Sequence, residues 1–223
     1  MSTFGTQICK KFHPDGTAAV YPGNTVVSDA TPETKAYQVM SECLDMLQSV
    51  GVDKLFIPLP KDSYHMTVIR GVNDLVRDQA FWPPALPLDA SMTEVDDYMS
   101  AAIKIVPNPG AMRMRFGEAR ITEEDFRISM LPADAEQERV LRQYRNQVAD
   151  AIGLRLPGHD AYTFHITLAY TWHLPDQDQQ TIICELKTKM DKLLSEQPVV
   201  ELHPPHIAFY RDMLSFSATR LER

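Results

Sequence analysis

The sequence predicts an α+β fold with mainly antiparallel sheets, duplicated in two halves. Short β-prone segments come in pairs, these pairs alternate with amphipathic helical segments, and a five-residue pattern occurs twice, at 64–68 and 164–168. Paired neighbouring strands are usually joined as antiparallel hairpins, so few parallel crossovers are needed. With 223 residues, 44% of them hydrophobic, the chain can form one large domain or two small lobes.

Four helices are predicted from apolar residues spaced three and four positions apart. They cover residues 32–50, 93–106, 133–152 and 175–194. Thr31 is a candidate cap for the first helix, and Gly51 and Gly153 are natural ends of the first and third helices. Cys43 and Cys184 fall within helical patterns, where we expect them to be small core residues.

Strands are predicted where β-branched, aromatic or alternating apolar residues lie between turn residues. They cover residues 25–27, 55–57, 64–70, 112–121, 126–131, 162–172, 199–202, 207–210 and 214–217. The proline-rich residues 73–92 should form an ordered loop, because apolar side chains such as Trp82 need burial. We expect a single two-lobed domain over residues 1–223, with pseudo-repeat halves at about 17–110 and 111–223.

The repeated pattern reads aromatic, His, apolar, Thr and apolar. Alternate residues of a strand share one face, so His65 shares a face with Thr67. His165 likewise shares a face with Thr167. The aromatic and apolar positions then face a core: Tyr64, Met66, Val68, Phe164, Ile166 and Leu168. The chain has seven His, so one copy of the pattern can arise by chance and is better explained as a structural strand with a partly buried His. This explanation fits two copies poorly.

Two His residues facing one another across a cleft suit acid–base chemistry. Near neutral pH, one neutral imidazole can remove a proton while a protonated one supplies another. A Thr hydroxyl on the same face can stabilise an anion between them. A phosphodiester is the natural substrate, because its displacement has an entering oxygen and a leaving oxygen on opposite sides of phosphorus.

The doubled His-apolar-Thr-apolar pattern resembles that of the two-histidine (2H) phosphoesterase superfamily, which includes RNA-ligase/cyclic phosphodiesterases. The resemblance implies a bilobal α+β fold with helices on the outside and a central groove. It also implies catalysis by His65 and His165, with no metal and no other cofactor. Thr67 and Thr167 would contact the phosphate. The segments around Gly23 and the second copy look most similar to a little-characterised branch, so a substrate does not carry over.

Several further residues are candidates for binding substrate. Arg155 and His159 flank the turn before the second copy and could add a phosphate contact. Tyr21 and Asn24 lie beside a Pro-Gly break and could line the pocket, although a turn role for Asn24 is favoured.

Strand parity places three more side chains on the core side of the motif strands: Arg70, Tyr170 and Trp172. Arg70 lies at a strand end and could turn toward the groove, but a structural salt bridge is favoured. A base-stacking role for Tyr170 and Trp172 stays open but is not preferred. A metal site is not predicted. The five His residues from His159 onward lack the HExxH and Cys/His zinc spacings, and prolines separate His203 from His206.

The leading hypothesis is a metal-independent phosphodiesterase acting on a 2′,3′-cyclic nucleotide or an RNA-terminal cyclic phosphate. Two alternatives stay open: a non-catalytic protein that binds a nucleotide or RNA end, and a structural domain with independently buried His residues. The net charge of −8 argues against a DNA duplex as partner. We expect no membrane association and a cytoplasmic monomer, because no long apolar run or CxxC pair is present and the three cysteines suit a reducing compartment.

Overall fold

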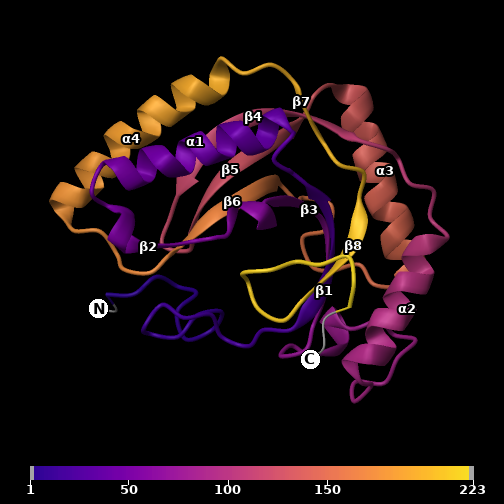
Figure 1. Cartoon of the computed structure of the whole chain (residues 1–223). Helices are drawn as coiled ribbons and strands as arrows, with labels where there is room; N and C mark the ends of the chain where they lie inside the picture. The colour runs from indigo at the N-terminus through magenta and orange to yellow at the C-terminus, as the bar shows by residue number, and fades with distance from the viewer. Residues whose placement is uncertain (1–2, 221–223) are drawn as a thin grey trace.

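The computed structural model describes residues 3–220. Within this part of the chain, four α-helices surround one eight-stranded sheet (Figure 1). The helices are α1 (Lys35–Ser49), α2 (Met92–Lys104), α3 (Ala135–Ile152) and α4 (Gln177–Ser195). The strands are β1 (Gly23–Asp29), β2 (Phe56–Pro58), β3 (His65–Asn73), β4 (Met112–Ile121), β5 (Asp125–Pro132), β6 (Phe164–Thr171), β7 (Val200–Leu202) and β8 (His206–Tyr210).

The sheet runs in the order β7-β4-β5-β6-β3-β1-β8, and β2 adds to β6. Every strand pair is antiparallel, which confirms the predicted α+β class. The strands that carry the two motif copies, β3 and β6, are neighbours at the centre, where Met66 pairs with Ile166. The two predicted sheets are therefore joined into one curled sheet at the motif strands. The division into halves at 17–110 and 111–223 stays a proposal.

The helices pack in two pairs on the curled sheet (Figure 1). Helix α1 lies along α4 and β7, and α4 packs on β4, whereas α2 packs against α3. Each helix buries an amphipathic face, as predicted from its apolar spacing; in α1 the buried residues include Val39, Met40, Cys43 and Leu47. A helix from the first half of the chain thus covers strands of the second half.

Local chemistry sets the helix ends. Thr34, not Thr31, caps α1, because its hydroxyl accepts a hydrogen bond from the Tyr37 backbone N–H. Gly153 ends α3 in the left-handed conformation at φ 68°, as expected. Cys43 is buried, but Cys184 is exposed on α4, so its predicted place in the core is wrong. The apolar stripe of α4 does not include position 184.

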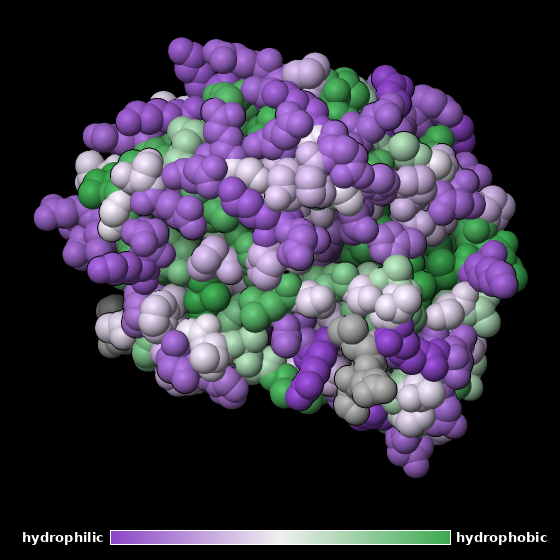
Figure 2. Space-filling view, in the orientation of Figure 1, coloured by the Kyte–Doolittle hydropathy of each residue, from purple (hydrophilic) through white to green (hydrophobic). Residues whose placement is uncertain are grey.

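The N-terminal segment and the C-terminal tail form a second, smaller core beside the sheet. Its buried members are Ile8, Phe12, Leu59, Tyr170, Tyr210 and Met213. The expected strand at 214–217 is wrong, because within the described residues only Ser217 bridges Phe209 there. Polar side chains dominate the face in Figure 2, and hydrophobic ones lie mainly in a band across its middle. Most of the large apolar side chains are buried. No helix in residues 3–220 has the length and apolarity required to cross a bilayer.

Both motif strands contain a β-bulge at the last position of the motif, directly after the Thr, and the bulge changes which side chains share a face. On β3, Val27 pairs with Thr67 but Val26 pairs with Ile69, so Val68 is an inserted residue. The insertion reverses the alternation beyond it. Arg70 therefore lies on the same face as His65, and its predicted core-side position is wrong.

The bulge on β6 falls at the same place in the second copy. Arg127 pairs with Thr167 and Phe126 pairs with Ala169, so Leu168 is the inserted residue. Tyr170 is turned by this bulge toward the face that carries His165, which again corrects the prediction. Up to each bulge, the predicted alternation is confirmed, since the aromatic and apolar positions of both motifs are buried.

Candidate active site

The two motif copies line one cavity of about 750 Å³. His65 and Thr67 reach it from β3, and His165 and Thr167 reach it from β6. Because Met66 pairs with Ile166, the antiparallel register sets His65 across from Thr167 and Thr67 across from His165. The two His side chains thus occupy diagonal positions of one four-residue cluster. The structure brings the predicted pairs together.

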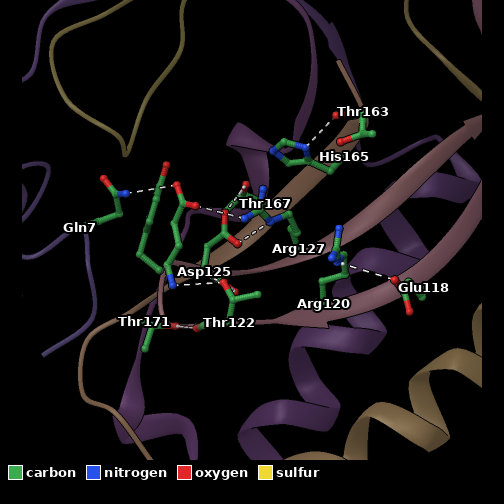
Figure 3. Close-up of polar contacts among 12 residues, drawn as sticks. Gln7, Glu118, Arg120, Thr122, Asp125, Arg127, Thr163, His165, Thr167 and Thr171 are labelled. Carbon is green, nitrogen blue, oxygen red and sulfur yellow. Dashed lines mark hydrogen bonds and ion pairs between the residues drawn. The ribbon is translucent and has the colours of Figure 1, made fainter. Parts of the chain in front are cut away.

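Each imidazole is held by the same kind of hydrogen bond. Nδ1 of His65 lies 2.8 Å from the Ser63 carbonyl oxygen. Nδ1 of His165 lies 3.3 Å from the Thr163 carbonyl oxygen, and Figure 3 shows this second contact. A carbonyl only accepts, so Nδ1 must donate in both rings. The neutral tautomer is thereby defined, and it leaves Nε2 of each ring unprotonated and able to accept a proton.

Burial lowers the pKa of both His residues, because desolvation disfavours the charged imidazolium. For His165 the pKa falls to about 4, with the positive charge of Arg127 as the next cause. For His65, the hydrogen bond to the Ser63 carbonyl and then the nearby carboxylate of Asp29 oppose the lowering of the pKa. The ring of Phe216 also covers His65, with centroids 4.3 Å apart. Both imidazoles are therefore neutral near pH 7 in the free protein.

Charged side chains from β5 surround the second copy (Figure 3). Arg127 Nε lies 2.7 Å from Asp125 Oδ1, and the Arg127 guanidinium also pairs with Glu124 at 3.2 Å. The Thr167 hydroxyl donates to Asp125 Oδ2 at 3.5 Å. Burial raises the pKa of Asp125 to about 6, so this carboxyl group changes charge close to neutral pH.

Lys11 reaches the same end of the cavity from the N-terminal segment. Its ammonium donates to the Tyr170 hydroxyl at 3.2 Å and lies 4.9 Å from the centre of that ring. Burial lowers the pKa of Lys11, while Tyr21, Glu124 and Asp125 oppose the shift. Lys11 thus adds a cation next to the carboxylates around Thr167.

Of the four predicted binding residues, two line the cavity. Tyr21 does so, and Asn24 also lies in the wall. The Asn24 side chain is fully buried, donates to Asp96 and accepts from the Val72 backbone N–H. Its amide therefore holds β1 to α2 and β3. Because Asn24 lies within β1, the favoured turn role is wrong.

Arg155 and His159 are absent from the cavity lining. Arg155 pairs with Asp150 and Asp160 at the surface, and His159 is buried against Asn146. Their expected contact with a phosphate therefore has no support from the geometry. Within residues 3–220, no group of three or more His, Cys, Asp or Glu is arranged to hold a metal ion.

Sequence reasoning missed several cavity residues: Lys11, Arg70, Asp125, Arg127, Tyr162 and Phe216. Asp125 and Arg127 alternate along β5, a signal of one strand face, but the facing of that strand depends on its pairing with β6. No local signal marks Lys11 or Phe216, which reach the cavity through the folding of both chain ends.

Comparison with known proteins places this geometry in context. A family model described as 2H-phosphodiest, domain of unknown function (DUF1868), matches residues 11–124. A conserved protein of unknown function from Agrobacterium tumefaciens strain C58 is 27% identical, covering 97% of this chain and 92% of its own, with a TM-score of 0.87. That protein therefore shares the whole fold.

Two further crystal structures are more distant. TT0787 of Thermus thermophilus is 15% identical over 83% of this chain and 85% of its own, with a TM-score of 0.44. Escherichia coli LigT complexed with 3′-AMP is 8% identical over 86% of this chain and 88% of its own, with a TM-score of 0.43. These TM-scores are too low for a comparison of the sites. No curated protein matches the sequence.

Proposed function

Because the chain belongs to the 2H-phosphodiesterase family, we propose that it hydrolyses a cyclic phosphodiester, either a 2′,3′-cyclic nucleotide or the 2′,3′-cyclic phosphate of an RNA terminus. The observation that carries the proposal is the diagonal arrangement of two His-Thr pairs in one cavity. In this arrangement a phosphate between the imidazoles would have a proton acceptor on one side and a proton donor on the other.

In the proposed reaction, Nε2 of one His removes a proton from water, whose oxygen forms the new bond to phosphorus. The bond from phosphorus to one ribose oxygen breaks, and the other His donates a proton to that oxygen. The hydroxyls of Thr67 and Thr167 donate to the phosphoryl oxygens, on which negative charge increases in the transition state. Water is consumed and a phosphomonoester is formed.

We assign the base role to His165 and the acid role to His65. Because burial and Arg127 lower its pKa to about 4, His165 is unprotonated throughout the neutral range. His65 lies near Asp29, whose charge favours the protonated imidazole, and a bound anionic phosphate adds to this effect. His65 can therefore enter the reaction protonated when substrate is bound.

A panel of substrates tests this function. The full-length protein is incubated with the four nucleoside 2′,3′-cyclic phosphates and with an oligoribonucleotide that ends in a cyclic phosphate, with and without EDTA. We expect phosphomonoester products at the same rate in both conditions, since the two His residues supply both proton transfers. Loss of activity in EDTA would refute the metal-independent mechanism. Tight binding without product would instead indicate the alternative function, a binding protein for a nucleotide or RNA end.

A small phosphorylated ligand is also consistent with the net charge of −8, because a compact anion needs only local cations whereas a duplex needs an extended basic surface. A monomeric state and a cytoplasmic location stay predictions.

A further inference from the structure

Arg70 is a cavity cation that, unlike Arg127, has no carboxylate within ion-pair distance in the described part of the chain. The charged residues of the lining are Lys11, Arg70, Glu124, Asp125 and Arg127. Arg127 is paired with both acidic residues, and Lys11 lies near them. Within residues 3–220, Arg70 forms no ion pair; its guanidinium is exposed and donates to the Pro157 carbonyl oxygen at 3.2 Å.

The surroundings of Arg70 are also positive. Arg145 lies buried behind the same wall and donates to the carbonyl oxygens of Val68 and His159. Burial is the main cause that lowers the pKa of Arg145; the charges of Arg142 and Arg70 add to it, and Tyr162 and Asp160 oppose it. Asp160 itself pairs with Arg155. Arg142 also pairs with Glu138 at 3.6 Å. Within residues 3–220, the positive charge without an ion pair at this end of the cavity is therefore that of Arg70, with Arg145 behind it.

Backbone donors without a hydrogen-bond partner in residues 3–220 lie in the loop whose Pro157 carbonyl Arg70 contacts. Gly158 and Ala161 line the cavity in the loop between α3 and β6. Neither backbone N–H donates a hydrogen bond within residues 3–220. Exposed N–H groups next to a guanidinium are typical components of phosphate sites, because both donate to anionic oxygens.

The position of this cluster relative to the His-Thr pairs indicates what it would bind. The bulge at Val68 puts Arg70 on the same face as Thr67, three residues further along, which separates their Cα atoms by at most about 10 Å. We propose that Arg70, with the N–H groups of Gly158 and Ala161, binds a second phosphate of the substrate.

On a ribose whose 2′ and 3′ oxygens hold the reacting phosphate, the remaining position for a phosphate is the 5′ oxygen. The proposed substrate class, which rests on the proposed function, is therefore a 2′,3′-cyclic phosphate that also carries a 5′-phosphate. In a mononucleotide this group is a monoester, and at an RNA terminus it is the diester to the preceding nucleotide.

Three substrates and four proteins test the proposal. The substrates are adenosine 2′,3′-cyclic phosphate, its 5′-phosphorylated form and the cyclic-phosphate-terminated dinucleotide ApA. The proteins are wild type, Arg70→Gln, Arg70→Lys and the control Arg155→Gln, whose Arg lies outside the cavity. The readout is the ratio of kcat/KM with and without the 5′-phosphate.

We expect this ratio to be on the order of 10 in wild type and in Arg155→Gln, because a charge-assisted hydrogen bond is lost without the 5′-phosphate. The ratio should fall to about 1 in Arg70→Gln. It should be intermediate in Arg70→Lys, which keeps the positive charge but lacks the planar pair of N–H donors of a guanidinium. A preference for the monoester over the dinucleotide, or the reverse, distinguishes a nucleotide from an RNA end. A ratio of about 1 in wild type, or a ratio that survives in Arg70→Gln, would overturn the proposal.

A binding measurement separates this inference from the proposed function. Calorimetry compares adenosine 3′,5′-bisphosphate with adenosine 3′-monophosphate, and we expect an Arg70-dependent gain for the bisphosphate. If no cyclic phosphate is hydrolysed but the bisphosphate binds more tightly and this difference requires Arg70, the second phosphate site is supported and the hydrolase function is refuted. If hydrolysis occurs and the gain is absent, the second phosphate site is refuted.

Discussion

The His-Thr copy on β3 and the copy on β6 have the same backbone features but different charged neighbours. In both, Nδ1 of the His donates to the carbonyl two residues earlier, and a bulge follows the Thr by one residue. The β6 copy lies among Arg127, Asp125 and Lys11, whereas the β3 copy is followed by the unpaired Arg70. The repeated motif thus positions the groups, and the non-repeated strands around it determine their protonation and their partners.

The largest expected effect concerns the two imidazoles themselves. Replacement of His65 or His165 by Ala should each lower kcat by at least about 100-fold, because each His carries out one proton transfer. The double variant should lose little more than either single variant, since the two groups act as a unit. Initial rates on the cyclic-phosphate panel measure this.

His13→Ala is the control, because His13 is exposed on the N-terminal segment and outside the cavity lining. A decrease in kcat of less than tenfold on replacement of either cavity His would contradict the prediction, since the two copies would then not take part in one reaction.

Arg145 distinguishes the copies structurally, because it binds the bulge of β3 and not that of β6. Its guanidinium donates to the carbonyl oxygen of Val68, the bulge residue, and stacks 4.7 Å from the Tyr162 ring centre. Arg145→Gln should lower the free energy of unfolding by about 2–4 kcal/mol, since buried carbonyl groups lose a charged donor.

Urea denaturation measures this loss, and Arg139→Gln on the exposed side of α3 should change the stability by less than about 0.5 kcal/mol. A loss of stability as small as that of Arg139→Gln would contradict the structural role given to Arg145.

Asp125 gives the second copy a pH dependence that the first lacks. Above pH 6 its carboxylate compensates Arg127. As pH falls through about 6 it becomes neutral, and Arg127, then paired with Glu124 alone, attracts an anion more strongly. Asp125→Asn should therefore lower KM for a cyclic nucleotide at pH 7.5. We expect a decrease of roughly threefold, because a partly exposed ion pair contributes about that much to binding. At pH 5 the variant and wild type should agree.

Steady-state kinetics at the two pH values, read as the ratio of KM between variant and wild type, measure this dependence. Diester substrates keep a single negative charge over this range, so the comparison reports on the protein. A ratio that is independent of pH would contradict the role given to Asp125.

The smallest expected effect is a change in the pKa of one His residue, which shows that Arg127 acts on His165 and not on His65. Arg127→Gln should raise the pKa of His165, because it removes a positive charge that disfavours the imidazolium, but burial keeps that pKa below its ordinary value. The pKa of His65 should not change. NMR titration of both rings measures the two pKa values. Arg70→Gln is the control, because it also removes a cation from the cavity. A change at His65 as large as that at His165 would refute the assignment.

The α+β class, the four helices and the alternation within each motif were predictable from the sequence, because periodic apolar spacing reflects burial directly. The bulges at Val68 and Leu168 were not, since an inserted residue is defined by the partner strand. As a result, Arg70 and Tyr170 were placed on the wrong face. Arg155 shows the converse error, where proximity in sequence to a motif does not bring a side chain to the cavity.

The pairing of β1 with β8, and of α1 with α4, joins the beginning of the chain to its end. Such contacts close very long loops, and chains dominated by them fold slowly because the loop-closure entropy is lost before the contacts form. During synthesis, β1 and α1 must wait for partners that are translated much later. The cavity residues Met213 and Phe216 are also translated after both motif strands, so a nascent chain holds both His-Thr copies before it holds a complete site.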